Sequence, residues 1–182
     1  MSAADFWSNR ERAQADVEEV SRVRSLLQKA TPVRVELDIN EVVQQVSVLV
    51  RNETARNRVQ VRLQLAAGLP RVQGDRVQLQ QVLINLIMNA IDAMRTATDR
   101  ARYLDIMSAK HADGVVVRVQ DSGIGLNPDR LERIFEPFYT TKPQGIGIGL
   151  SISRSIIESH GGRLWTEPAS YGAIFQFTLP NQ

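Results

Sequence analysis

The sequence predicts an α+β two-layer sandwich: a mixed β-sheet covered on one face by about three helices and preceded by one N-terminal amphipathic helix. Short segments of alternating apolar and polar residues recur along the chain. Longer segments with apolar residues at three- and four-residue spacing separate them, and the late strand segments follow one another as hairpins. With 182 residues, the chain is the size of one domain with an extra element.

The first expected element is a helix over residues 9–30, a stretch that contains no Gly or Pro. Its apolar residues recur on one stripe, and Pro32 ends it because the residue before a proline disfavours helix. We therefore expect two parts, an N-terminal helix at 1–31 and a folded domain at 32–182. The apolar stripe either packs on that domain or forms part of a helical bundle or dimer interface, with a homodimer through residues 9–30 as one outcome.

The first half of the domain is expected to hold two strands and two helices. Alternation marks the strands, and an Asn or Asp before an apolar-periodic run marks each helix start. In chain order we expect a strand at 33–37, a helix over 41–56 capped by Asn40, a strand at 59–65, a turn-rich connector at 66–74, and a long helix from a cap at Asp75 to about Ala97.

The second half is expected to begin with a hairpin and end with two more strands. Between them lies a long stretch rich in Gly and Pro, and such irregular segments in a small domain are usually functional. The expected elements are hairpin strands at 103–110 and 115–120, an irregular segment at 121–149 with a helical piece at 129–134, a helix over 148–159, and strands at 163–167 and 173–179.

Composition excludes several classes of function. There is no Cys, so disulfides, thiolate metal sites and a Cys nucleophile are excluded, and two His residues make a multi-His metal site untenable. The formal net charge of +2 does not call for nucleic acid. No apolar run reaches the roughly 18 residues of a membrane span, and the N-terminus lacks a signal-peptide layout. We expect a cytoplasmic chain without membrane contact, and a longer protein that contained it could still be membrane-anchored.

Two asparagines in the middle of the long helix need an explanation. Asn85 and Asn89 are four residues apart, so they share a helix face, and Asp92 follows on the same side. Asn inside a helix costs up to about 0.7 kcal/mol relative to Ala. The stripe is either a solvent-facing polar surface or a row of oxygen atoms facing a ligand or a hard cation such as Mg²⁺.

Glycines cluster at two places in the later half. Asp121, Gly123 and Gly125 end the second hairpin strand, where a carboxylate can accept from the amine of a planar ligand, although the same residues also suit an ordinary turn. Glycines at every second position open the next helix, where backbone N–H groups favour an anion. That loop comprises Gly145, Ile146, Gly147, Ile148, Gly149 and Leu150.

Between the two glycine clusters lies a segment of residues 126–146 that we expect to act as a lid. Phe135 and Phe138 are expected to anchor this otherwise loose segment to the core. Lys142 stands just before the second cluster, where it either reaches a phosphate or is an ordinary solvated lysine.

Taken together and in this order, the motifs resemble the ATP-binding catalytic domain of bacterial two-component sensor histidine kinases, within the superfamily of gyrase, MutL and the heat-shock chaperone. The sequences around Asn89 and Thr141 are most similar to those of the nitrogen-regulation and oxygen-sensing branch. The motifs that carry the resemblance are Asn85-Leu-Ile-Met-Asn89, Asp121-Ser-Gly-Ile-Gly125, Phe135-Glu-Pro-Phe138, Gly145-Ile-Gly-Ile-Gly-Leu150 and His160-Gly-Gly162.

The resemblance implies an α/β sandwich that binds ATP and Mg²⁺ between the asparagine helix and the lid. It assigns Asn89 as the Mg²⁺ ligand, with Asn85 one turn earlier and Asp92 nearby, and Asp121 as the acceptor of the adenine amino group. Gly123 and Gly125 let the chain pass close to the base. The loop from Gly145 to Leu150 lies beside the phosphates, and Lys142 is the expected γ-phosphate contact. Asn85, Asn89 and Lys142 are the residues expected to serve catalysis.

The resemblance also implies the reaction and its partners. Relatives that hydrolyse ATP carry a Glu where Asn85 stands, and an amide cannot serve as a general base near pH 7. The expected reaction is therefore transfer of the γ-phosphoryl group to a histidine on a dimerisation hairpin, and from there to a response regulator receiver domain. Neither His111 nor His160 fits the acceptor, so the chain alone is not expected to autophosphorylate.

Two alternatives stay open at this point. One is an ATP-driven conformational clamp of the gyrase or chaperone type, which Asn85 disfavours. The other is a non-catalytic module that dimerises and binds nucleotide as a structural ligand, which the intact asparagines and glycines disfavour. The absence of an acceptor hairpin is read either as truncation, with residues 1–31 as its remnant, or as a natural split of the chain.

Overall fold

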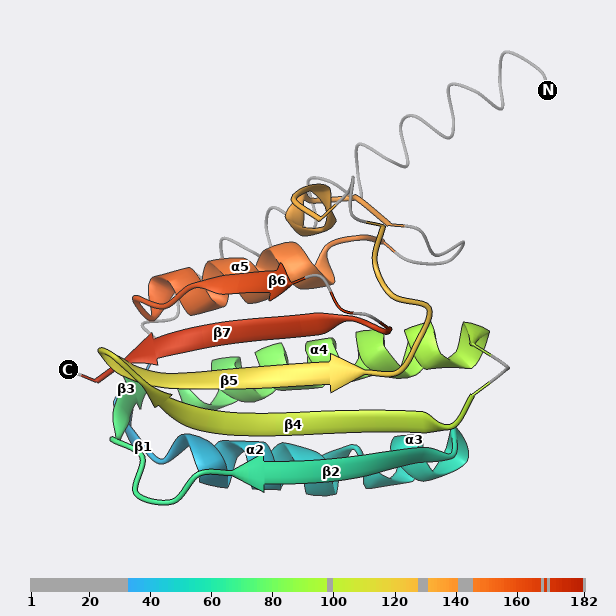
Figure 1. The fold of residues 1–182 in the computed structure, drawn as a ribbon. Helices are drawn as coiled ribbons and strands as arrows, with labels where there is room; N and C mark the ends of the chain where they lie inside the picture. The colour runs from blue at the N-terminus through green and yellow to red at the C-terminus, as the bar shows by residue number, and fades with distance from the viewer. Residues whose placement is uncertain are drawn as a thin grey trace, which may run out of the picture. The chain divides into compact units, whose positions relative to one another are not determined.

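A five-stranded mixed sheet organises residues 34–182 in the computed structural model (Figure 1). The structure describes residues 33–97, 100–127, 131–140, 146–167, 169 and 171–181. The helix expected over residues 9–30 lies outside these ranges.

The strand order explains why the sheet is mixed. β2 pairs in parallel with β4, and every other neighbouring pair is antiparallel, including the β4–β5 hairpin. The parallel pair requires a crossover, which contains the 21-residue helix over Arg76–Thr96. Across the sheet the strands are β2 (Val59–Leu65), β4 (Arg102–His111), β5 (Gly114–Asp121), β7 (Ile174–Pro180) and β6 (Leu164–Glu167).

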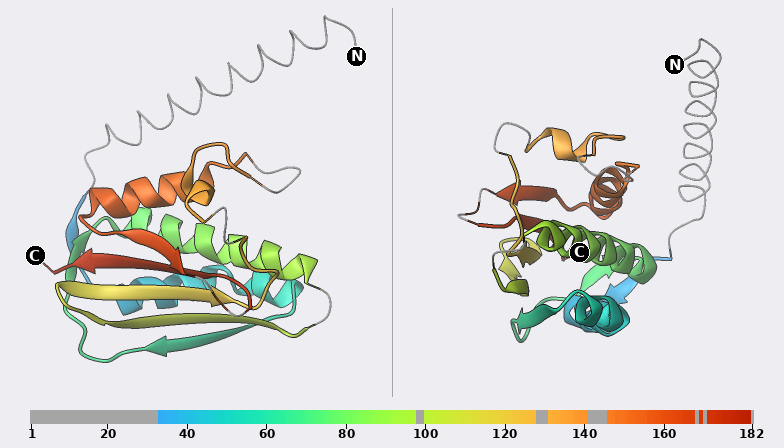
Figure 2. Two further views of the ribbon diagram at one scale, coloured as in Figure 1. Left: turned by 45° about the horizontal axis from the view of Figure 1, so that its top comes forward. Right: turned by 90° about the vertical axis from the view of Figure 1, so that its right-hand side faces the viewer.

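The helices form a second layer on one face of this sheet (Figure 2). α4 lies in the middle of that layer and packs against α2, α5 and β5. This arrangement confirms the predicted α+β sandwich. The remaining elements are α2 (Ile39–Leu49), α3 (Arg51–Arg56), α4 (Arg76–Thr96), the 3₁₀ turn η2 (Arg133–Phe135), α5 (Gly149–Ser159), and a small antiparallel pair of β1 (Val35–Leu37) with β3 (Val72–Gly74).

Alternation along the strands builds the core between the two layers. On β5, Val115, Val117 and Val119 are buried, and the residues between them are less so. The buried stripe of α4 faces them, and Leu83 and Leu86 are almost fully enclosed. Each such side chain contributes about 1.5–3 kcal/mol when removed from water. α4 is thereby fixed as a rigid support with its polar face turned away from the core.

Three expectations about local structure were wrong in detail. Asp38, not Asn40, caps α2, accepting from the Asn40 backbone N–H at 2.9 Å. The Asn40 side chain instead accepts from Ser108 Oγ at 2.6 Å and donates to the Ala66 carbonyl, tying α2 to the sheet.

The other two differences concern element boundaries. The helix expected over 41–56 is divided at Val50 into α2 and α3, and β3 forms inside the expected connector. Asp75 caps α4 as predicted, accepting from the N–H groups of Val77 and Gln78.

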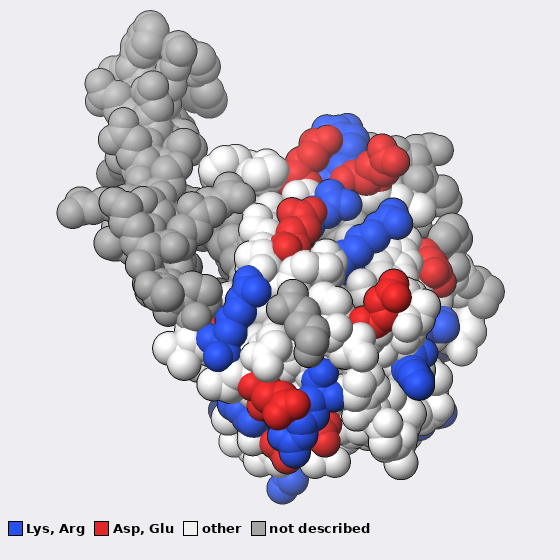
Figure 3. Space-filling model, turned by 90° about the vertical axis from the view of Figure 1, so that its left-hand side faces the viewer, with Lys and Arg blue, Asp and Glu red and all other residues white. Residues whose placement is uncertain are grey.

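The surface at one end of the sheet carries both signs of charge. Figure 3 looks onto the left-hand end of Figure 1, which includes the β4–β5 turn, and shows Lys or Arg interspersed with Asp or Glu. Among the residues that the structure describes, no helix is both long and apolar enough to cross a membrane.

His160 joins the end of α5 to the start of α4. Its ring is 2% exposed, Nε2 accepts from the Asp75 backbone N–H at 2.9 Å, and Nδ1 lies 2.7 Å from the Ile156 carbonyl. A carbonyl can only accept, so Nδ1 carries the proton and the ring is held in one tautomer. His160 therefore has a structural role.

We expect His160→Ala to lower the free energy of unfolding by about 2–4 kcal/mol, because it opens a cavity and leaves the partly buried Asp75 N–H without an acceptor. Urea denaturation followed by circular dichroism measures the change. His111→Ala is the matched control, since His111 is exposed at the end of β4, and we expect an effect below about 0.5 kcal/mol. Equal effects of the two substitutions would contradict the structural role.

Candidate functional site

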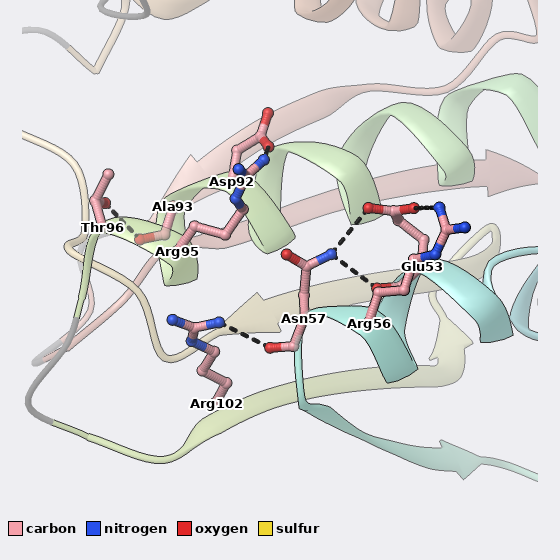
Figure 4. Close-up of polar contacts among 8 residues, drawn as sticks. All are labelled: Glu53, Arg56, Asn57, Asp92, Ala93, Arg95, Thr96 and Arg102. Atoms are coloured by element: carbon pink, nitrogen blue, oxygen red, sulfur yellow. Dashed lines mark hydrogen bonds and ion pairs between the residues drawn. The ribbon is translucent and has the colours of Figure 1, made fainter.

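The polar face of α4 forms the floor of the candidate site. Asn85, Asn89 and Asp92 are half-buried, whereas Leu86 and Ala90 on the opposite stripe belong to the core. Asp92 also forms a 3.8 Å ion pair with Arg95 one turn later (Figure 4). The three side chains therefore share one face of α4, and this face lies at the edge of the core rather than fully in solvent.

Asn85 brings the start of α5 against α4. Its Nδ2 donates to Ser153 Oγ at 2.9 Å. A Cβ on Gly149, the first residue of α5, would lie only 2.4 Å from Asn85 Oδ1. Only a glycine at position 149 allows α5 to approach Asn85 this closely, and the Asn85 amide oxygen faces the N-terminal turn of α5. Leu150 packs against the core from this same turn.

Asp121 ends β5 as a buried carboxylate, 4% exposed. Its Oδ1 accepts from the backbone N–H of Gly123 at 2.7 Å and of Ala173 at 3.3 Å. Burial raises the pKa of Asp121 to about 6, and these two hydrogen bonds offset only part of that effect. Both of these bonds end on Oδ1.

Glycines allow three segments to converge around Asp121. A Cβ on Gly123 would lie 2.7 Å from the Ala93 backbone carbon of α4, and a Cβ on Gly172 would lie 1.8 Å from the Asp121 carbonyl oxygen. Gly125 packs against Gly172 from the other side, with a positive φ of 80°. The turn after β5, the turn before β7 and the end of α4 therefore meet through backbone, with no side chains between them.

The segment after Gly125 is anchored by Phe135 and not by Phe138. Phe135 is buried, meets Phe175 edge-on at 6.3 Å, and lies under the Arg154 guanidinium at 4.3 Å. Phe138 is 49% exposed, so the expectation that it anchors the lid was wrong. Its backbone N–H instead donates to the Gly147 carbonyl at 2.9 Å, and both residues have positive φ. This backbone clasp turns the Phe138 ring outward.

The structure brings most of the predicted residues together. Gly147 forms the clasp, Ile148 caps α5, and Ile146 is exposed. Lys142 and Gly145 lie outside the described residues.

Sequence reasoning missed three contributors, namely Ser153, Gly172 and Ala173. A glycine directly before the last strand is a turn signal that could have pointed to the last two.

The arrangement suits a ligand with an amine at one end and negative charge at the other. The Asp121 carboxylate is an acceptor in a dry setting, and the first N–H groups of α5 favour an anion. Amide oxygens are acceptable Mg²⁺ ligands, provided that phosphate or water completes the shell. The described residues hold no cluster of three or more His, Asp or Glu that could bind a metal ion by itself.

The sequence and the structure were both compared with known proteins. Residues 74–182 match the family model described as histidine kinase-, DNA gyrase B- and HSP90-like ATPase. The sensor protein TdiS of Thauera aromatica is 43% identical over 87% of this chain and 30% of its own length. The sensor protein FixL of Bradyrhizobium diazoefficiens is 51% identical over 67% of this chain and 24% of its own. This chain thus spans less than a third of these curated relatives.

Among solved structures, the catalytic domain of histidine kinase ThkA in a nucleotide-free form superposes with a TM-score of 0.72. It is 38% identical, and the match covers 81% of this chain and 95% of that domain. A second structure holds ThkA in complex with the response regulator protein TrrA, with 33% identity, a TM-score of 0.70, and coverage of 91% of this chain and 49% of that one.

We expect Asp121→Asn to stabilise the ligand-free domain at pH 7.5 by roughly 3 kcal/mol, the free energy that corresponds to the raised pKa. The native state binds the proton more tightly than the unfolded chain, so the wild-type free energy of unfolding falls as pH rises from about 4 to about 6. The Asn variant lacks this fall, and the gap between the two should close near pH 4. Urea denaturation across this pH range measures it.

The control for this experiment is Asp113→Asn, which removes an exposed carboxylate from the β4–β5 turn. We expect that variant to follow the wild type at every pH within about 0.5 kcal/mol. A loss of stability in Asp121→Asn at pH 7.5 would show instead that the ionised carboxylate holds the turn together.

Proposed function

This chain belongs to the family of histidine kinase-, DNA gyrase B- and HSP90-like ATPases, and on that premise we propose how its residues bind and use ATP. It carries the ATP-binding catalytic domain of a sensor histidine kinase. We propose that, within the whole protein, this domain transfers the γ-phosphoryl group of Mg²⁺-bound ATP to a histidine on a helical hairpin. The phosphoryl group would then pass to a response regulator.

Adenine recognition is assigned to Asp121. Its Oδ1 is already engaged by two backbone N–H groups, so the proposed acceptor of the adenine amino group is the other carboxylate oxygen. The contact of Gly123 with Ala93 supports this, because it leaves bare backbone rather than a side chain beside the carboxylate. Gly125 likewise places bare backbone beside the carboxylate. Asp92 directly precedes Ala93 in α4, and we place it on the nucleotide side of the helix.

The phosphate end is assigned to the start of α5 and the loop before it. Gly147 and Gly149 allow the backbone to fold tightly here, and the free N–H groups of the first helical turn favour negative charge. The flanking Ile146, Ile148 and Leu150 are proposed to border the phosphates. Lys142 and Gly145 are proposed as further contacts on sequence grounds alone.

Asn89 is assigned as the ligand of Mg²⁺, with Asn85 beside the phosphates. An amide oxygen on a rigid helix fits a cation that keeps waters and nucleotide oxygens in its shell, and bound Mg²⁺ would neutralise phosphate charge. Asn85 is supported by its contact with Gly149 and its hydrogen bond to Ser153, which hold the amide against α5. Asn85, Asn89 and Lys142 would then position the γ-phosphate for transfer.

The observation that carries the choice of reaction is the setting of Asn85. An amide whose N–H₂ group donates to Ser153 has no basic site with which to activate water. A general base typically contributes about 10²–10⁴-fold to a rate, so water should compete poorly for the phosphoryl group. The acceptor should be a histidine on a separate hairpin, since His160 is buried with both ring nitrogens engaged.

Partners are proposed from the same premise. ThkA has been observed bound to the response regulator TrrA. By analogy we propose that a receiver domain takes the phosphoryl group from the hairpin that this domain serves. Residues 1–31 are proposed to derive from such a hairpin and to support a homodimer through residues 9–30.

The function is tested by mixing this chain with a separately produced helical hairpin that carries a histidine followed by an acidic residue. With Mg²⁺ and γ-labelled ATP, we expect acid-labile label on the hairpin and none on this chain alone. A hairpin with the His→Gln substitution is the matched control and should stay unlabelled. Stable label on the isolated chain, or an unlabelled hairpin despite measured nucleotide binding, would overturn the proposal.

Replacing Asn85 with Glu should convert the site toward hydrolysis. Glu supplies a carboxylate that can accept a proton from water, and we expect ATP turnover to rise roughly tenfold or more, within the range of a general base. Asn85→Gln is the matched control, since it has nearly the same shape without the basic oxygen, and should not rise. Phosphate release measures both rates, and equal rates with nucleotide binding retained would count against the role of Asn85.

A further inference from the structure

A second concave site lies at the opposite end of the sheet from the β4–β5 turn, where α3 and α4 end and β4 begins. It is a cavity of about 580 Å³, within the range of small-molecule sites, roughly 300–1,000 Å³. Figure 4 shows part of its wall, with Arg56 and Asn57 from the end of α3, Arg95 from α4 and Arg102 from β4. Its complete lining is Arg56, Asn57, Arg58, Arg95, Arg100, Ala101 and Arg102.

Five of these seven residues are arginines, and we name the cavity the arginine pocket. Guanidinium groups stay charged at any physiological pH, so the wall carries fixed positive charge. This differs from the end of the domain in Figure 3, where both signs are mixed.

Two carboxylates among the described residues pair with arginines of this wall. Glu53 approaches Arg56 at 4.0 Å, and Asp92 approaches Arg95 at 3.8 Å. The two arginine side chains are 81% and 63% exposed, and such loose, solvated pairs hold little energy. Both guanidinium groups can therefore turn to a stronger anion. Arg102 is fixed in the wall, because its guanidinium donates to the Asn57 carbonyl at 2.8 Å.

Helix ends account for part of the cluster. Arg56 and Arg95 lie in the last turns of α3 and α4, where positive charge is favourable. Arg58 ends α3 with a positive φ of 54°, and Arg102 donates to the carbonyl of Asn57, the residue before Arg58. Arg100 lies outside any helix, and the cavity gathers all five guanidinium groups on one wall.

We propose that the arginine pocket binds a small, multiply charged phosphate compound. Guanidinium forks match pairs of phosphate oxygens, and several of them around one cavity select for high charge density over a single carboxylate. The pocket shares none of its lining with the residues assigned to ATP, and it adjoins that site only through the pair of Arg95 with Asp92 among the described contacts. The class of ligand is a compound with two or more phosphate groups, free or carried on a larger molecule.

Inorganic tripolyphosphate, in buffer without divalent ions, is the probe for this proposal. Titration into ¹⁵N-labelled protein should shift the amide signals of Asn57 and Ala101 in the pocket. The double substitution Arg58→Gln with Arg100→Gln should weaken that binding at least tenfold. Arg71→Gln with Arg163→Gln is the matched control, because it removes the same charge from exposed positions elsewhere and should leave the affinity within about twofold.

The outcomes separate this proposal from the nucleotide site. Shifts confined to Gly123, Gly147 and Gly149 would place the anion in the ATP site and overturn the proposal. Equal weakening by the two double variants would show nonspecific charge attraction, which also overturns it. Should the first pair fail to fold by circular dichroism, Arg56→Gln with Arg58→Gln serves the same test. ADP binding, measured on the same samples, reports independently on the ATP site.

Discussion

Close contact between bare backbone and α4 is the constraint on which the proposed ATP site depends. Gly123 rests on Ala93 and Gly149 rests on Asn85, each at a distance that no side chain could share. α4 can support both because its other stripe is buried under the sheet and cannot shift without opening the core. Positions 85 and 93 are about two helical turns apart, and this spacing sets the distance between the proposed phosphate end and the proposed adenine end of the site.

The same region shows why a binding site costs stability. Asp121 is held in a dry setting where its charge is disfavoured, with compensation from only two backbone N–H groups. A residue chosen for stability alone would be neutral here. We have proposed that the adenine amino group donates to this carboxylate, and residues with shifted pKa values of this kind are common at functional sites.

Much of this could be predicted from local sequence, and the rest depended on distant contacts. The strands at 59–65 and 115–120 and the Asp75 cap were predictable, because alternation and capping are local signals. The paired asparagines were predictable as one face of a helix, because their spacing is helical. β3 and the Asp38 cap were not, since a three-residue strand forms only when β1 is beside it and Asn40 already matched the preference for an N-cap. The arginine pocket was likewise hidden, because Arg56 and Arg100 are brought together by the crossover between β2 and β4.

That crossover has a consequence for the order in which the chain can assemble. Val59 of β2 pairs with Arg102 of β4, and the whole of α4 lies between these two residues in the sequence. The register of β2, at the edge of the sheet, can therefore be set only after this long connection has closed. The hairpin of β4 and β5 needs no such closure, and local pairings form faster than distant ones. We expect β4, β5, β7 and α4 to come together first and β2 to join last. A nascent chain would then hold α4 in place before β2 had joined the sheet, a stage at which Arg62 and the neighbouring glutamines keep the unpaired β2 segment soluble.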